Sequence, residues 1–189
     1  MNWKEYEQKF EEILIGNTKV GIYQEDDIQL YTKLNEARQS RWLEKVELLP
    51  ELVELLQDLT APQHWVVITE PWCGDASHIT PIIHLLQSAT YKVSIDFQLR
   101  DSASEIEKYL YKGAKAIPIL IVRDENGKDL FHWGPRPAPA QELYIKLKGS
   151  YEPYEDMKIT LQKWYNNDKG VTLQKELLEK FKFVKDNLN

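Results

Sequence analysis

Apolar residues recur at helical spacing along the first third of the chain. Between Trp3 and Leu14 they fall three and four residues apart and so form one stripe of a helix. Asp26 and Asp27 are placed to cap a second helix that runs toward Val46. Pro50 can open a third, shorter helix that ends near Leu59. The pattern predicts a helical N-terminal extension over residues 1–61.

The pattern then changes to alternating strands and helices. Trp65–Thr69 is a short, continuously apolar and β-branched run, typical of a central strand covered on both faces. Residues 79–86 have helical spacing, with Pro81 inside the helix. Residues 91–99 alternate like a second strand, and a short helix is expected around residues 106–110. This half of the pattern predicts two parallel strands joined by a helix.

A hairpin and a helix complete the expected unit. Pro118–Val122 predicts a strand, and Asp124-Glu125-Asn126-Gly127 is a hairpin turn signal. Leu130–Trp133 would return antiparallel, before a loop at residues 134–137 and a closing helix that contains Leu143, Ile145 and Leu147. The predicted order is β-α-β-α-β-β-α over residues 62–148. Beyond it, residues 149–189 predict a helical C-terminal extension of two helices that is broken near residues 166–170.

Composition limits the class of protein. At 189 residues and 42% hydrophobic, the chain can form one well-developed core. A net charge of −6 argues against nucleic acid as a partner, since such binding draws on clustered Lys and Arg. The N-terminus has no signal-peptide pattern, and no apolar run approaches the roughly 20 residues that span a bilayer. We expect a cytoplasmic protein without a membrane partner; the oligomeric state stays open.

The single cysteine, Cys73, lies in Glu70-Pro71-Trp72-Cys73-Gly74-Asp75-Ala76, between a predicted strand and a predicted helix. At a helix N-terminus, free backbone N–H groups and the helix dipole stabilise a thiolate and lower the pKa of the thiol. Asp75 acts in the opposite direction if its carboxylate faces the sulfur. The sequence leaves the sign of the balance open.

Two further motifs join the cysteine in a known pattern. Ala116-Ile117-Pro118-Ile119 comes 44 residues later, and Trp133-Gly134-Pro135-Arg136-Pro137 follows the hairpin. With Trp72-Cys73-Gly74-Asp75, they resemble the thioredoxin family, and most closely a bacterial branch with this Trp-Cys-Gly-Asp motif. The resemblance implies a thioredoxin-like α/β fold, with a mixed sheet in three α/β/α layers. It also implies a cis peptide bond before Pro118 and an Ile117 backbone that pairs with an extended substrate.

The chain departs from the dithiol members of that family. Ala76 occupies the position of their second, resolving cysteine, and Val67 replaces the buried carboxylate that assists it. Any turnover by Cys73 therefore needs a thiol from solution or from the partner, such as glutathione, bacillithiol or a substrate cysteine. No resident cofactor or metal is expected, because the histidines lack the spacing of a metal site. The predicted substrate-binding residues around the catalytic Cys73 are Trp72, Gly74, Asp75, Ile117, Pro118, Gly134 and Arg136.

Two classes of function compete. The leading hypothesis is a single nucleophilic thiol that performs thiol-disulfide exchange or forms mixed disulfides with a protein or small-molecule partner. The alternative is a redox-silent peptide-binding or chaperone-like module. Arg136 is either a groove residue that favours an anionic partner or a structural, ion-paired arginine. Peroxide reduction is disfavoured because Glu70 stands where peroxiredoxin-type sites place a threonine, and cluster binding because monothiol glutaredoxins carry a different motif.

Overall fold

The computed structural model describes residues 1–18, 21–150 and 153–188. Residues 151–152 and 189 of the predicted C-terminal extension lie outside the described part. Four N-terminal elements precede the sheet; the three α-helices agree closely with the predicted ones, and the 3-10 turn was not predicted. They are α1 (Trp3–Leu14), the 3-10 turn η1 (Gly21–Gln24), α2 (Asp26–Lys45) and α3 (Pro50–Gln57).

Helices α1 and α2 begin in different ways. The Asn2 side chain caps α1 by accepting from the Glu5 N–H, and the Glu5 side chain accepts from the Asn2 N–H. These two bonds form a capping box. Helix α2 begins at Asp26, and its N-cap residue, Glu25, makes no side-chain cap. Asp26 and Asp27 therefore lie in the first turn, where their charges favour the helix dipole without closing a cap.

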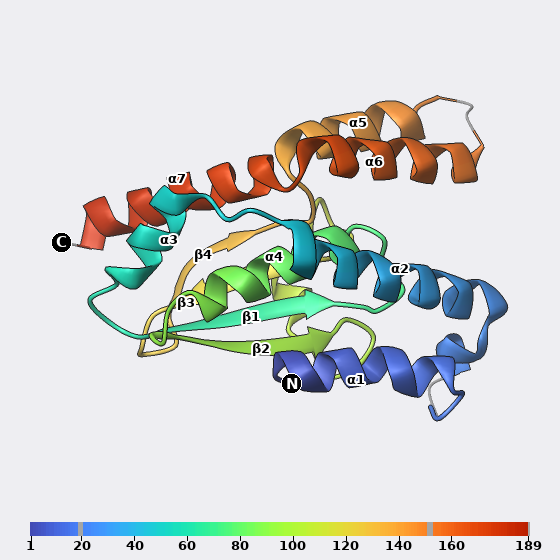
Figure 1. The fold of residues 1–189 in the computed structure, drawn as a ribbon, viewed down its shortest axis with the longest axis horizontal. Coiled ribbons are helices and arrows are strands. Elements are labelled where there is room, and N and C mark those ends of the chain that lie inside the picture. The colour runs from blue at the N-terminus through green and yellow to red at the C-terminus, as the bar shows by residue number, and fades with distance from the viewer. Residues whose placement is uncertain (19–20, 151–152, 189) are drawn as a thin grey trace.

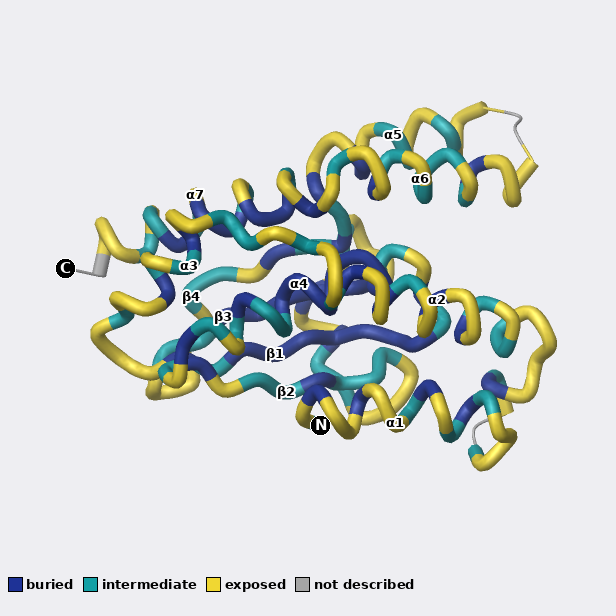
Figure 2. The backbone as a smooth tube through the Cα atoms, viewed as in Figure 1, coloured by how far each residue is buried: buried dark blue, intermediate teal, exposed yellow. Residues whose placement is uncertain are grey.

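The sheet has four strands in the order β2-β1-β3-β4. Strand β1 pairs parallel with β2 and antiparallel with β3, and β3 pairs antiparallel with β4. Every residue of β1 except His64 is buried, as Figure 2 shows for the centre of the sheet. The strands are β1 (Gln63–Thr69), β2 (Val93–Leu99), β3 (Ile119–Arg123) and β4 (Asp129–Trp133).

The remaining helical elements surround this sheet. Between β2 and β3 the expected short helix is only a 3-10 turn, because Tyr109, with φ −127° and ψ 37°, already leaves the helical region after Lys108. The arrangement of a mixed sheet with helical extensions at both ends confirms the predicted α/β fold class (Figure 1). The elements are α4 (Ala76–Ser88), η2 (Ile106–Lys108), α5 (Ala138–Lys148), α6 (Tyr154–Asp168) and α7 (Val171–Leu188).

Alternate residues of the central strands separate two apolar clusters. Trp65 and Val67 belong to the larger cluster, which α1, α3, α4 and α7 cover. Val66 and Ile68 belong to the smaller one, on the face covered by the chain around η2. This alternation follows from the period of two along a strand. Cys73 belongs to the smaller cluster.

Helix α7, and not α5, closes the larger layer. The Phe181 ring of α7 stacks on Trp65 of β1, with ring centroids 5.6 Å apart. From α5 only Ala140 joins this core, and Ile145 remains half exposed. The helix that the sequence predicts after β4 is present as α5, but it packs mainly on α6 (Figure 1). None of the helices in the described residues is both long and apolar enough to cross a membrane.

Candidate functional site

Cys73 lies in the turn between β1 and α4. Its backbone N–H donates to the Glu70 carbonyl at 3.0 Å, and its carbonyl accepts from the Ser77 N–H at 3.2 Å. The side chain is 7% exposed. Its Sγ donates to the Ile117 carbonyl oxygen at 3.6 Å. The fold thus brings together the thiol and the segment before β3, which are 44 residues apart in the chain.

The segments before β3 and after β4 are in direct contact. The Ile117–Pro118 and Gly134–Pro135 peptide bonds are both cis. Gly134 has φ +131°, and a Cβ at this position would lie 2.3 Å from the Pro118 carbonyl oxygen. Only glycine fits both the backbone angle and the space. Gly134 therefore allows the loop after β4 to pack against the Ile117–Pro118 segment, which contacts the thiol.

Asp75 forms a largely buried ion pair with Arg136. One carboxylate oxygen lies 2.6 Å from the guanidinium Nη2, and the two side chains are 12% and 13% exposed. The other oxygen accepts a hydrogen bond from the Tyr165 hydroxyl at 2.8 Å. Asp75 occupies the N-cap position of α4 but makes no side-chain cap bond. Its carboxylate faces the loop after β4 and α6 instead of the helix amides.

Arg136 is held by groups of the protein itself. Besides Asp75, it donates through Nη1 to Gln141 at 3.0 Å and lies over the Tyr144 ring, 3.9 Å from the centroid. Its Nε is buried and has no hydrogen-bond partner among the described residues. This geometry is that of the structural, ion-paired arginine, the second of the two interpretations that the sequence left open. An anionic ligand would have to compete with Asp75.

Trp72 and Gly74 flank the thiol. The Arg100 guanidinium lies over the Trp72 ring, 4.7 Å from its centroid. The indole N–H of Trp72 is buried without a hydrogen-bond partner in the described part of the chain. Gly74 is exposed, and a Cβ there would meet nothing within 4 Å. Gly74 thus leaves one side of the turn open.

The thiol of Cys73 is neutral at rest. Burial raises its pKa from an ordinary value of 9.0 to about 12, and the negative charge of Asp75 adds to the shift. The backbone N–H groups of Ala76 and Asp75 and the charge of Arg136 act in the opposite direction but do not balance it. The sequence left open whether the pKa of Cys73 is lowered by the helix N-terminus or raised by its surroundings. Desolvation of the thiol decides that it is raised.

Glu70 is a buried acid that the sequence interpretation did not include in the site. It is fully buried and accepts hydrogen bonds from the Tyr23 hydroxyl at 2.6 Å and from the Asp101 N–H at 2.9 Å. Burial raises its pKa above the ordinary value. Glu70 ties η1 and the loop after β2 to the turn that holds Cys73. A charged residue directly after an apolar strand was the only sequence signal for it.

His78 and Tyr165 form a second buried set beside the site. The Trp42 indole N–H donates to His78 Nδ1 at 2.6 Å, so Nε2 carries the proton and donates to Gln162 at 3.0 Å. The His78 ring stacks on Tyr165 with centroids 4.4 Å apart. Burial lowers the pKa of His78 to about 3. No sequence motif marked Tyr165, and His78 was considered only among the histidines that lack the spacing of a metal site.

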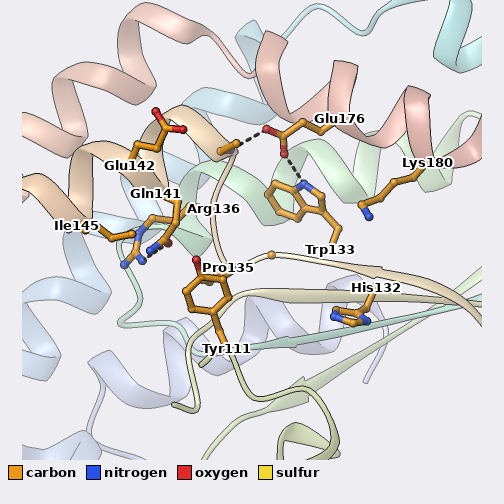
Figure 3. Close-up of a pocket in the computed structure, with 12 residues that line it drawn as sticks. Tyr111, His132, Trp133, Pro135, Arg136, Gln141, Glu142, Ile145, Glu176 and Lys180 are labelled. Carbon is orange, nitrogen blue, oxygen red and sulfur yellow. Dashed lines mark hydrogen bonds between the residues drawn. The ribbon is translucent and has the colours of Figure 1, made fainter. Parts of the chain in front are cut away.

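A pocket of about 490 Å³ is lined in part by Arg136. Figure 3 shows Trp133 and Lys180 on one side of it and Arg136 with Ile145 on the other. Glu176 of α7 accepts from the Trp133 indole N–H and from the Ala138 N–H, both at 2.7 Å. Cys73 does not line this pocket. No group of three or more His, Cys, Asp or Glu side chains that could hold a metal ion occurs among residues 1–18, 21–150 and 153–188.

The solved structures similar to this chain share its fold at low sequence identity. One is a protein of unknown function from Pseudomonas aeruginosa, 17% identical, with a TM-score of 0.51 over 73% of this chain and 86% of that one. Another is an HIV epitope scaffold, 18% identical, with a TM-score of 0.51 over 97% of this chain and 95% of that one. A search of curated proteins gives no match.

The family comparison covers more of the chain than the sequence motifs do. A family model described as Thioredoxin matches residues 21–148, from η1 through α5. The match includes the Cys73 turn, the segment before Pro118 and the loop with Arg136, and it leaves α6 and α7 outside. The chain belongs to the thioredoxin family.

Proposed function

We propose that this chain uses Cys73 as a single nucleophilic thiol that forms mixed disulfides with a protein or small-molecule disulfide. One observation carries the proposal: Cys73 Sγ lies 3.6 Å from the Ile117 carbonyl. An extended segment that paired with the Ile117 backbone would run past the sulfur at contact distance. The backbone N–H groups of Asp75 and Ala76, at the start of α4, interact with the thiol and stabilise negative charge on the attacking sulfur.

The chemical step uses one thiol of this chain. Cys73 loses its proton to solvent, and its sulfur attacks one sulfur of the partner disulfide. A new S–S bond forms while the partner bond breaks, and the leaving thiolate takes up a proton. The mixed disulfide is released when an external thiol, such as glutathione, bacillithiol or a partner cysteine, attacks it. Ala76 offers no internal thiol for this second attack.

The neutral resting thiol limits the reaction to partners that bind first. At neutral pH a thiol with a pKa of about 12 is almost entirely protonated, so a disulfide that does not first dock beside the thiol reacts slowly. A partner that docks beside Ile117 raises the local concentration of its disulfide. The proposal therefore predicts selective exchange and not general disulfide reduction.

The test is adduct formation measured by intact-protein mass spectrometry. Native protein is incubated with oxidised glutathione, oxidised bacillithiol and a disulfide-bonded peptide, next to Cys73→Ser. We expect a mixed disulfide on Cys73 that is absent in Cys73→Ser and is removed by a reductant. Formation of the adduct only after unfolding in urea would overturn the proposal.

Burial of the thiol also favours a second candidate, a redox-silent module that binds extended peptides. Cys73 is 7% exposed and its pKa is raised to about 12, as in a packing cysteine. In this case Cys73→Ala keeps full affinity for a bound peptide. Loss of binding in that variant, with the fold intact by circular dichroism, would exclude the module.

The proposal extends to the origin and setting of the protein. We infer a bacterial branch of the family with the Trp-Cys-Gly-Asp motif, and residues 62–148 as its central unit between helical extensions 1–61 and 149–189. The cytoplasm is the compartment in which small thiols could release the mixed disulfide. Fractionation of the native host and detection with an antibody would test the compartment.

A further inference from the structure

We propose that Tyr165 of α6 is a positioning residue that sets the reactivity of Cys73 by holding the Asp75 carboxylate in its ion pair with Arg136. This inference rests on the proposed function, because it describes how that thiol is regulated. Helix α6 lies beyond the segment that the family model matches. The proposal thus assigns a role in the site to a C-terminal helix.

The carboxylate of Asp75 is fixed from both sides. Tyr165 donates to one oxygen at 2.8 Å, and Arg136 lies 2.6 Å from the other. Tyr165 is 5% exposed, and its ring is stacked on His78. Burial raises the pKa of Tyr165 well above its ordinary value, so its hydroxyl stays protonated and remains a donor. The bond therefore persists at every pH at which the thiol can be assayed.

Without Tyr165, the carboxylate has an alternative position. Asp75 is the N-cap residue of α4, and an aspartate there ordinarily accepts hydrogen bonds from the first helix amides. The donors of that cap would be the N–H groups of Ser77 or His78, next to the Ala76 and Asp75 N–H groups that stabilise the thiolate of Cys73. A carboxylate that turned toward the cap would bring its negative charge to the same end of the helix. The added negative charge disfavours the thiolate.

Other titratable groups also interact with the thiol, and their charge states must not change between the variants in the test. Tyr6 of α1 and Arg100 of the loop after β2 interact with its charge, as do Arg136 and Tyr165. Tyr6 is buried and its pKa is raised, and Arg100 is always charged. Tyr6 hydrogen-bonds to Thr69 and Arg100 to Asp101, and among the described residues neither bonds to Asp75. Variants at Asp75 and Tyr165 therefore leave these two groups in place.

The experiment measures the rate of Cys73 alkylation by iodoacetamide between pH 8 and 10. It compares wild type, Asp75→Asn, Tyr165→Phe and the double variant. Asp75→Asn should react about tenfold faster or more, because removal of a neighbouring negative charge lowers a pKa by about one unit or more. Tyr165→Phe keeps the ring stacked on His78 and should react severalfold more slowly. The double variant should match Asp75→Asn within about twofold, since Tyr165 acts through Asp75.

A merely structural role for Tyr165 gives a different pattern. If the hydroxyl only stabilises α6, Tyr165→Phe loosens the cover over the thiol and speeds alkylation equally in both backgrounds, which would overturn the proposal. An unchanged rate in Tyr165→Phe would also overturn it. Alkylation needs no disulfide partner, so the effect of Tyr165 on Cys73 can be demonstrated even if no mixed disulfide forms. In that case the proposed function fails and the role of Tyr165 stands.

Discussion

A Cβ atom on Gly134 would lie 2.3 Å from the carbonyl oxygen of Pro118. The backbone of Gly134 thus packs closely against Pro118 and joins the loop after β4 to the segment that faces Cys73. Arg136 follows two residues later in the same loop and pairs with Asp75. The position of this glycine therefore determines both the wall beside the thiol and the ion pair that adjoins it.

Gly134→Ala should destabilise the protein by about 2 kcal/mol or more, because the residue has φ +131° and no space for a methyl group. Urea unfolding monitored by tryptophan fluorescence measures the change. Gly74→Ala is the matched control, since a Cβ there meets nothing within 4 Å. Equal stability of the two variants would contradict the assigned contact.

Alkylation of wild-type Cys73 should accelerate about tenfold per pH unit from pH 7 to 10 without a plateau, because the pKa of the folded thiol is about 12. Iodoacetamide labelling followed by mass spectrometry gives the profile. Protein unfolded in urea is the control and should level off near the ordinary thiol pKa of 9.0. A plateau below pH 9 in the native protein would show that the thiol is already activated.

The same shift makes stability depend on pH. The pKa of Cys73 is raised on folding, so its stabilising effect is complete below pH 9.0 and is lost as the pH rises toward 12. For each pH unit in that window, the free energy of unfolding of wild type should fall by about 1.4 kcal/mol more than that of Cys73→Ala. Urea unfolding at pH 8, 9, 10 and 11 tests this difference. Parallel curves for the two proteins would refute it.

His78 gives the opposite dependence. Its pKa falls from 6.5 to about 3 on folding, so its contribution is complete above pH 6.5 and is lost as the pH falls. Between pH 6 and 4, wild type should lose about 1.4 kcal/mol per unit relative to His78→Asn. Trp42→Phe removes the donor to Nδ1 and should cost about 1–2 kcal/mol at pH 7. No difference between wild type and His78→Asn in acid would rule out a buried neutral imidazole.

Glu176 should support helix α5 from outside it. Its two oxygens accept from the Trp133 indole and the Ala138 backbone N–H at the start of α5. Glu176→Ala removes the acceptor of both bonds, one exposed and one partly buried, and should cost about 1 kcal/mol. Glu179→Ala, an exposed position one turn along α7, is the control and should stay within about 0.5 kcal/mol of wild type. Comparable losses in both variants would exclude this specific role.

The sequence was sufficient for the elements whose patterns are local. The 3.6-residue stripe of α1 gave its exact bounds, Trp3–Leu14, and the apolar run of β1 identified the buried strand. Through their resemblance to the thioredoxin family, the motifs around Cys73, Pro118 and Gly134 predicted that their segments meet, and the structure brings these segments together.

Features that depend on distant partners were outside the reach of the sequence. The bond between Tyr165 and Asp75 joins positions 90 residues apart, and no local pattern marks it. The sign of the Cys73 pKa shift depends on how far the thiol is desolvated, which only packing determines. The choice of α7 over α5 as the closing helix depends on which apolar face meets Trp65, and both helices carry such a face.

The stacking of Phe181 on Trp65 also bears on the order of events during synthesis. The first strand of the sheet leaves the ribosome more than 100 residues before the helix that covers it, since Trp65 and Phe181 are far apart in the sequence. Such long-range closure slows folding and leaves apolar surface open to aggregation in the nascent chain. A fragment that ends at residue 148, where the family match ends, would keep that surface exposed and should require a chaperone to stay in solution.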